Sequence, residues 1–106
     1  MTLQHIVLFA FPDELSDDDW ADMKRQVRSW PTEIGGIDRM RLGPSINSER
    51  TRGYQYLLYM ELADLDALVT YQRHPVHQHF LKWVLERDCK PLAFDYYLDE
   101  ETVVIP

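Results

Sequence analysis

The strongest constraint on the fold is a set of predicted strands that are apolar on both faces. Residues 3–11 (Leu-Gln-His-Ile-Val-Leu-Phe-Ala-Phe) are rich in β-branched and aromatic side chains, and both faces of this strand are apolar apart from His5. Residues 54–62 and 91–98 read as strands of the same kind. Helices from one chain cover only one face of a sheet, so the second face must meet something else, and the same face of another copy is the expected cover.

Two helical segments separate the predicted strands. The first begins at Ser16, an N-cap followed by three aspartates in the first turn, where carboxylates meet the positive end of the helix dipole. It ends over residues 31–36, which contain one proline and two glycines. The second segment begins after Asp64 and restarts at His74-Pro75, because proline disfavours a helical residue before itself and suits a first helical turn. The first segment carries an apolar stripe at helical spacing: Trp20, Met23, Val27 and Trp30.

With a further strand over residues 37–42, the order of elements is β-α-β-β-α-β. This order predicts an α+β, ferredoxin-like sheet with helices on one face. Residues 45–53 form the longest loop, and a single domain spans 1–106 with an acidic-then-apolar tail over 99–106. We expect a homodimer in which Val103-Val104-Ile105 packs on or near the interface.

Charge and cysteine content disfavour several classes of function. The chain has 11 Lys and Arg against 18 Asp and Glu, a formal charge of -7, so nucleic acid is not an expected partner. No run approaches the roughly 18–20 apolar residues of a membrane span, and the first residues lack the pattern of a signal peptide, so we expect no membrane partner and a cytoplasmic location. Cys89 is the single cysteine, which excludes an internal disulfide.

Several motifs together resemble the stress-responsive α/β-barrel family, usually called Dabb proteins. They are the strand His5–Phe11, Gly35-Gly36-Ile37, Gly43, Gly53-Tyr54, Tyr71 followed by His74-Pro75-Val76-His77, and Phe94-Asp95-Tyr96. The resemblance covers nearly the whole chain and implies a dimer whose two sheets close an α+β barrel. One departure is visible, since many members carry a histidine two residues after the Gly-Tyr tyrosine, where this chain has Tyr56.

The resemblance also implies a catalytic pair. A plant polyketide cyclase of this family catalyses an aldol cyclisation without a cofactor, and its acid–base Tyr and His match Tyr71 and His77. From the residues themselves, His77 lies one turn from Leu81 and would act as a general base if it faces the interior. The alternative is a structural histidine whose ring is hydrogen-bonded for burial alone.

Tyr71 and His5 complete the candidate catalytic set. An ordinary tyrosine pKa of about 10 suits Tyr71 as a hydrogen-bond donor to a carbonyl or enolate, and the alternative is a helix residue with a wet hydroxyl. His5 can bond His77, Tyr71 or Asp95 and so orient the base, and the alternative is a strand-end histidine near solvent.

Histidines at 74, 77 and 79 do not predict a metal site. Spacings of three and two do not place three imidazoles on one helix face, and no carboxylate joins them at ligand spacing. We expect His74 to bond backbone groups at a helix start and His79 to be solvated. Neither a metal nor a cofactor is expected.

Large side chains at several positions are candidates to line a substrate cavity. Stripes at these spacings more often form the core, and a pocket needs a void that a sequence does not report. The expected ligand is a small hydrophobic or aromatic molecule. The candidate substrate-binding residues are Val7, Phe9, Met23, Val27, Tyr56, Leu58, Met60, Phe80 and Asp95.

Two functions from different classes fit these observations. One is a cofactor-free acid–base cyclase or related lyase acting on a polyketide-like or other carbonyl substrate, in which His77 abstracts a proton, Tyr71 donates to the oxyanion and His5 positions His77. The other is a non-catalytic, stress-responsive dimer that binds a hydrophobic ligand. An open pocket reaching Tyr71 and His77 favours the enzyme, whereas a filled core between helices and sheet favours the binding protein.

Overall fold

Four antiparallel strands form one sheet, in which the first strand of the chain pairs with two of the others. The strands are β1 (Thr2–Ala10), β2 (Ile37–Pro44), β3 (Tyr56–Leu62) and β4 (Lys90–Leu98). β1 pairs with β3 on one side and β4 on the other, giving the order β2-β3-β1-β4. This computed structural model describes residues 2–105, so Met1 and Pro106, the outer limits predicted for the domain and its tail, lie outside the described residues.

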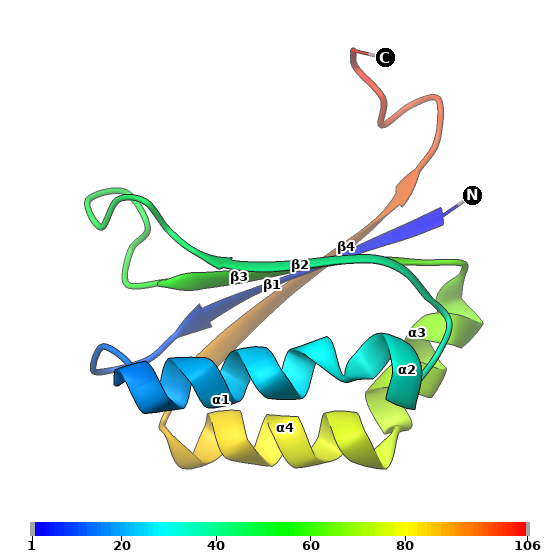
Figure 1. Cartoon of the computed structure of the whole chain (residues 1–106). Coiled ribbons are helices and arrows are strands. Elements are labelled where there is room, and N and C mark those ends of the chain that lie inside the picture. Colours follow the sequence, from blue (N-terminus) through cyan, green and yellow to red (C-terminus); the bar gives the residue numbers. More distant parts are fainter. Residues whose placement is uncertain (1, 106) are drawn as a thin grey trace.

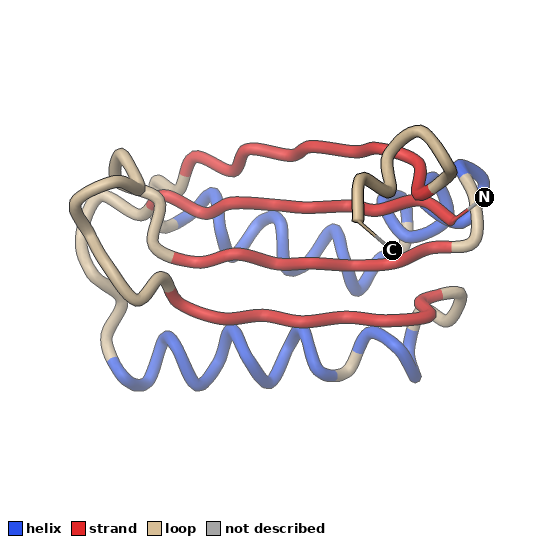
Figure 2. The backbone as a smooth tube through the Cα atoms, turned by 90° about the horizontal axis from the view of Figure 1, so that it is seen from above, coloured by secondary structure: helices blue, strands red, loops and turns tan. Residues whose placement is uncertain are grey.

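Helices cover one face of the sheet (Figures 1 and 2). They are α1 (Asp17–Arg28), α2 (Trp30–Glu33), α3 (Leu65–Arg73) and α4 (Pro75–Glu86). The predicted ferredoxin-like α+β architecture is therefore confirmed, with each predicted helical segment divided in two. None of the helices within residues 2–105 has the length and apolar character needed to cross a bilayer.

The helix starts follow the capping residues seen in the sequence. The Ser16 hydroxyl accepts a hydrogen bond from the Asp19 amide at the start of α1, and Asp64 caps α3 in the same way. His74 Nδ1 accepts from the Val76 amide, so the imidazole caps α4 as expected for a residue at a helix start. The break before α4 fixes where the side chains of its first turn point.

Several boundaries differ from the predicted ones, those of β1 and of the start of β4 by a single residue. The first helix stops at Arg28 rather than running through Trp30, because Pro31 lacks an amide hydrogen and is accommodated in the first turn of α2. β3 begins at Tyr56 rather than at residue 54. The Gln55 backbone still bonds those of Phe9 and Ser45, and its side chain bonds both backbone groups of Phe11. β2 extends beyond residue 42 to Pro44, since its pairing with β3 continues to that position.

The core lies between the sheet and the helices. Met23, Trp30 and Met60 are fully buried there, together with Leu58 and Val27. Burial of each such side chain contributes about 1.5–3 kcal/mol to stability, so this layer dominates the folding energy. It also fills most of the space between helices and sheet, which limits where a ligand can enter.

The opposite face of the sheet is uncovered and mostly apolar. Phe94 is 65% exposed, and Leu57, Leu92, Tyr96 and Leu98 are also exposed large side chains. The tail over residues 99–105 leaves β4 on this side, away from the helices (Figures 1 and 2). A contiguous apolar sheet face of this kind marks an interaction surface.

A hydrogen-bonded group of polar side chains interrupts the open face, although the strands were expected to be apolar on both faces. The Tyr59 hydroxyl donates to Gln4 Oε1 at 2.5 Å and lies 3.2 Å from Glu61 Oε2, while the Arg41 guanidinium stacks over the Tyr59 ring. The expectation is therefore wrong in part for β1 and β3, and also for β4, which carries Asp95 on the face toward the helices while Leu92, Phe94 and Tyr96 make its open face apolar. The remaining apolar area concentrates on β1 and β4.

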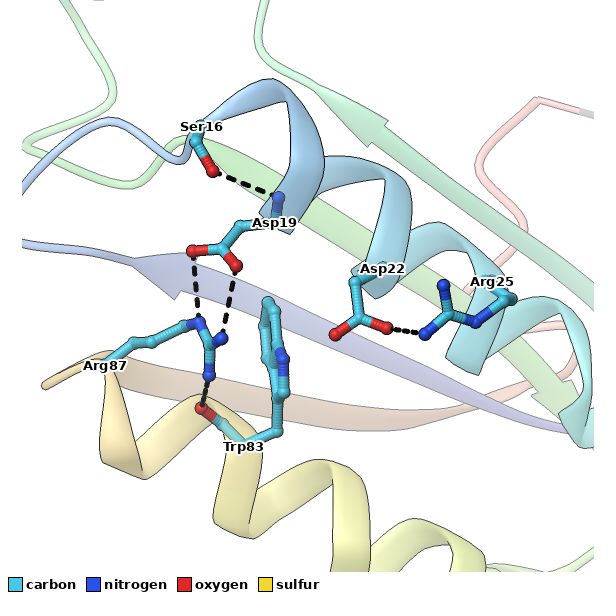
Figure 3. Close-up of polar contacts among 6 residues, drawn as sticks. All are labelled: Ser16, Asp19, Asp22, Arg25, Trp83 and Arg87. Atoms are coloured by element: carbon cyan, nitrogen blue, oxygen red, sulfur yellow. Dashed lines mark hydrogen bonds and ion pairs between the residues drawn. The ribbon is translucent and has the colours of Figure 1, made fainter.

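Arg87 ties the end of α4 to the start of α1 (Figure 3). Its guanidinium donates to both carboxylate oxygens of Asp19, at 3.1 and 3.2 Å, and to the Trp83 carbonyl at 3.1 Å. It also lies 3.9 Å from the Trp83 ring centroid, a cation–π contact. Asp22 and Arg25, in the same view, form a more exposed pair within α1.

We predict that Arg87→Ala lowers the free energy of unfolding by about 1–2 kcal/mol, because the bidentate pair and the cation–π contact are lost together at a partly exposed site. Lys82→Ala, which removes a solvent-exposed pair with Glu86, is the matched control and is expected to change it by less than about 0.5 kcal/mol. Denaturant unfolding measures both. Equal effects of the two substitutions would contradict a bridging role for Arg87.

Candidate acid–base site

A cavity of about 190 Å³ lies between the helix layer and the β1–β4 edge of the sheet. β1 contributes His5, Val7 and Phe9, and β4 contributes Pro91 and Ala93. The helices contribute Tyr71, Gln72, His77, Phe80, Leu81 and Val84, and β3 contributes Leu58. The cavity therefore brings together His5, Tyr71 and His77, the three candidate catalytic residues of the sequence analysis.

His5 is bonded to a carboxylate. β1 and β4 pair so that His5 stands directly opposite Asp95, and residues opposite one another share a face of the sheet. The His5 Nδ1–H donates to Asp95 Oδ1 at 2.5 Å, and His5 is only 3% exposed. Because a carboxylate only accepts, Nδ1 carries the proton of this bond, and in the neutral ring Nε2 is then an acceptor.

His77 is oriented by the backbone. Its Nδ1–H donates to the Gln72 carbonyl at 3.1 Å, so its Nε2 is likewise an acceptor. The centroids of the His77 and Tyr71 rings are 4.3 Å apart. The break at Pro75 makes this possible, because it allows the first turn of α4 to fold back over the last turn of α3.

Tyr71 lies between the two histidines. Its ring centroid is 5.6 Å from that of His5 in an edge arrangement, and the residue is 2% exposed. Within residues 2–105 its hydroxyl has no hydrogen-bond partner, and it is not among the fully buried polar atoms. The hydroxyl is therefore a donor open to the cavity.

Trp30 supports this cluster from the core. Its ring makes edge contacts with Tyr71, His77 and Phe80, at centroid distances of 5.4, 5.8 and 5.0 Å. Aromatic pairs in this geometry each contribute about 0.5–1.5 kcal/mol beyond burial. Trp30 therefore restricts the rotation of both reactive rings without lining the cavity.

Burial sets the protonation states of the two central groups. It raises the pKa of Tyr71 well above 10, and the nearby Asp95 carboxylate raises that pKa further. Burial lowers the pKa of His77 below 6.5, partly offset by the Gln72 carbonyl, and His5 adds a small further lowering. At pH 7 Tyr71 is a neutral donor and His77 a neutral acceptor, which is the pairing that acid–base chemistry needs.

Some predicted lining residues are not at the site. Val7, Phe9, Leu58 and Phe80 do line the cavity, and Asp95 reaches it through His5. Four predicted residues were misplaced, namely Met23, Val27, Met60 and Tyr56. The first three lie wholly within the core, and Tyr56 packs against Trp20 and Phe11. The periodicity of the sequence correctly predicted that these side chains point into the protein, but it does not show whether a residue lies beside the cavity or within the filled core.

Other lining residues were missed. Leu81 and Val84 lie at helical spacing from His77, and Pro91 and Ala93 alternate along β4 with Leu92 and Phe94 and so share the face of Asp95. The spacing of these four residues in the sequence could have identified them. The sequence gives no such indication for Gln72, because Gln72 binds His77 through its backbone carbonyl. Of the three partners predicted for His5, namely His77, Tyr71 and Asp95, His5 bonds Asp95, so it does not hold the His77 ring directly.

No metal centre accompanies this cluster. Nowhere in residues 2–105 do three or more His, Cys, Asp or Glu side chains gather closely enough to hold an ion. His79 is exposed on α4. Cys89 is buried, and burial raises the pKa of its thiol to about 11, so it is a thiol at neutral pH.

Comparison with known proteins identifies a family and a fold. The model of a family described as "Stress responsive A/B Barrel Domain" matches residues 3–98. A search of curated proteins found no significant match. The solved structure of hydroxynitrile lyase from Passiflora edulis is similar with a TM-score of 0.81, over 93% of this chain and 94% of that chain at 14% identity.

Two further solved structures share the fold. A dimeric ferredoxin-like protein of unknown function from Thermobifida fusca has a TM-score of 0.78, with 92% of each chain covered and 21% identity. SnoaB, a cofactor-independent oxygenase from Streptomyces nogalater, has a TM-score of 0.69, covering 93% of this chain and 94% of that chain at 11% identity. At these identities the likeness shows the fold alone.

We predict that His77 in the folded protein titrates with a midpoint below 6.5, because burial disfavours its charged form. The unfolded chain then binds the proton first, so the free energy of unfolding falls as pH drops below about 6.5. NMR titration of the imidazole in folded and denatured protein measures both midpoints. His77→Gln should flatten this part of the stability profile, and a folded midpoint at or above the denatured one would refute the assignment.

Proposed function

The chain belongs to the stress-responsive A/B barrel domain family, and from that premise we propose that it is a cofactor-free acid–base enzyme that acts on a small carbonyl compound. The observation that carries the proposal is the convergence of one neutral donor and two imidazole acceptors on a single cavity. Cyclase and lyase reactions of carbonyl compounds need a proton removed next to the carbonyl and a donor at the oxygen. The site supplies both kinds of group.

The roles follow from which atoms are unoccupied. His77 Nε2 abstracts the acidic proton, since Nδ1 is held by the Gln72 carbonyl. The Tyr71 hydroxyl donates to the carbonyl oxygen as negative charge develops there. His5, whose ring is held by the Asp95 carboxylate, is placed to accept or return a second proton on the other side of Tyr71.

The protein's shared fold with a hydroxynitrile lyase and a cofactor-independent oxygenase supports small-molecule chemistry of this general kind. The alternative is a dimer that binds a hydrophobic ligand in the same cavity and leaves it unchanged. The open cavity reaching Tyr71 and His77 favours the enzyme, because a binding protein has no need of unpaired proton-transfer groups.

We also propose that the protein is a homodimer joined through the open sheet face. Exposed apolar residues of β4 lie on that face, and the tail that follows β4 extends on the same side in Figure 1. The tail carries Val104 and Ile105, which are 88% and 85% exposed. A solved structure with the same fold is described as dimeric. In such a dimer, β4 contributes alternate residues to the interface and to the cavity.

Exchange of the methyl protons of acetophenone for deuterium, followed by NMR in deuterated buffer, reports proton abstraction without requiring the physiological substrate. We expect the protein to accelerate it and His77→Ala to lose about 10²–10⁴-fold of that acceleration. Tyr71→Phe keeps the ring packing and is expected to lose up to about 10²–10³-fold. His79→Ala, an exposed histidine on the same helix, is the control. Unchanged exchange in His77→Ala would end the acid–base proposal.

The dimer is tested by Phe94→Glu, which replaces the most exposed large apolar side chain of the open sheet face by a charge. We expect wild-type protein to scatter light as a dimer at micromolar concentration and the variant as a monomer, because a buried unpaired carboxylate opposes association. Leu65→Glu makes the same change at an exposed site on α3 and should leave the dimer intact. A monomeric wild-type protein would overturn the interface.

A further inference from the structure

The size of the cavity restricts what can enter it. A volume of about 190 Å³ lies below the roughly 300–1,000 Å³ of typical ligand pockets. An apolar cavity of about 150 Å³ in another protein is large enough to hold benzene. The cavity therefore accommodates a single six-membered ring with a short substituent, and a long chain would extend out of it.

The lining carries no fixed charge. Of the described residues that line the cavity, none is Lys, Arg, Asp or Glu, and eight are apolar. His77 is neutral at pH 7, and the Asp95 carboxylate lies behind His5, outside the lining, where it accepts a hydrogen bond from the His5 ring. A carboxylate placed here would lose its hydration without meeting an opposite charge, and a cation would meet only the Asp95 carboxylate, which is already bonded to His5 and separated from the cavity by its ring.

The polar groups of the lining are gathered in one region. His5, Tyr71 and His77 contact one another through their rings, whereas Phe9 and Phe80 meet edge to face at 6.0 Å in the apolar remainder. A ligand with one polar head and an apolar body matches this division. The head would meet the Tyr71 hydroxyl, and the ring would lie against the two phenylalanines and their aliphatic neighbours.

We infer that the substrate is an uncharged molecule about the size of one substituted six-membered ring, with a single carbonyl or hydroxyl head as its polar group. The inference rests on the proposed function for the fate of the ligand but not for its binding. It narrows the expected substrates from polyketide-like chains to compact neutral carbonyl compounds. It also separates substrates by charge, since an anion of the same shape is rejected.

Three isosteric probes test this with charge as the only large difference: benzamide, benzoate and benzamidinium. Binding at pH 7 is followed by the chemical shifts of the His77 imidazole. We expect benzamide to bind at least about tenfold more tightly than either ion, because the carboxylate of benzoate finds no cation in the lining and the amidinium finds only the Asp95 carboxylate, which is already bonded to His5. Equal or tighter binding of benzoate or benzamidinium, or no binding of benzamide up to its solubility, would overturn the inference.

Two substitutions locate the effect in the cavity. Leu81→Arg places a cation at the cavity lining and should improve benzoate binding by about tenfold, whereas Leu85→Arg, one turn later and exposed, should not. Ala93→Leu, on the exposed edge strand, should fill the cavity and abolish benzamide binding. If Leu81→Arg leaves benzoate binding unchanged, or Ala93→Leu leaves benzamide binding unchanged, the ligand is not in this cavity.

The probes also separate this inference from the proposed reaction. Selective benzamide binding without any acceleration of acetophenone exchange would sustain the ligand class and defeat the enzyme proposal. Accelerated exchange together with indiscriminate binding of the ions would sustain the enzyme and defeat the ligand class.

Discussion

The register between β1 and β4 is the constraint on which the site depends. It places Asp95 opposite His5 on the face that looks toward the helices, and it places Phe94 and Tyr96 on the other face. A slip of one residue would move Asp95 to the open face and leave the His5 ring without its partner. β4 is an edge strand with β1 as its one neighbour, so whatever covers its open face also steadies the carboxylate on the cavity side.

Burial keeps Tyr71 and His77, the two central proton-transfer groups, uncharged at neutral pH. The same low-polarity surroundings that keep Tyr71 protonated keep His77 deprotonated at neutral pH. Charge therefore develops only when a proton moves, and it develops beside a donor that is already in position. The Trp30 ring packs against the Tyr71 and His77 rings from the core, so these two side chains need little movement when a proton is transferred.

Local sequence signals predicted the fold and the membership of the cluster well. The Ser16 and Asp64 caps, the His74-Pro75 break and the two-faced apolar strands each have a mechanism that acts over a few residues. The misplaced residues show where such reasoning stops. Met60 and Leu58 are two residues apart on β3 and point to the same face of the sheet, yet only Leu58 lines the cavity. The alternation of a strand shows which face a residue occupies, but not which helix packs against it at that point.

The polar interactions were harder to predict for the same reason. The choice of Asp95 over His77 as the partner of His5 is decided by strand register across ninety positions of sequence. The Gln72 carbonyl that holds His77 belongs to the backbone and has no residue signature. Likewise, the Gln4, Tyr59 and Glu61 group on the open face arises from pairing between β1 and β3.

The pH dependence of protein-catalysed acetophenone exchange tests the central claim most directly. His77 must be neutral to accept a proton, so the rate should rise with pH through a midpoint below 6.5. Tyr71 must keep its proton, so the rate should stay level from there to beyond pH 10. A rate that instead climbs in proportion to hydroxide across this whole range, with no level region, would contradict proton transfer by His77.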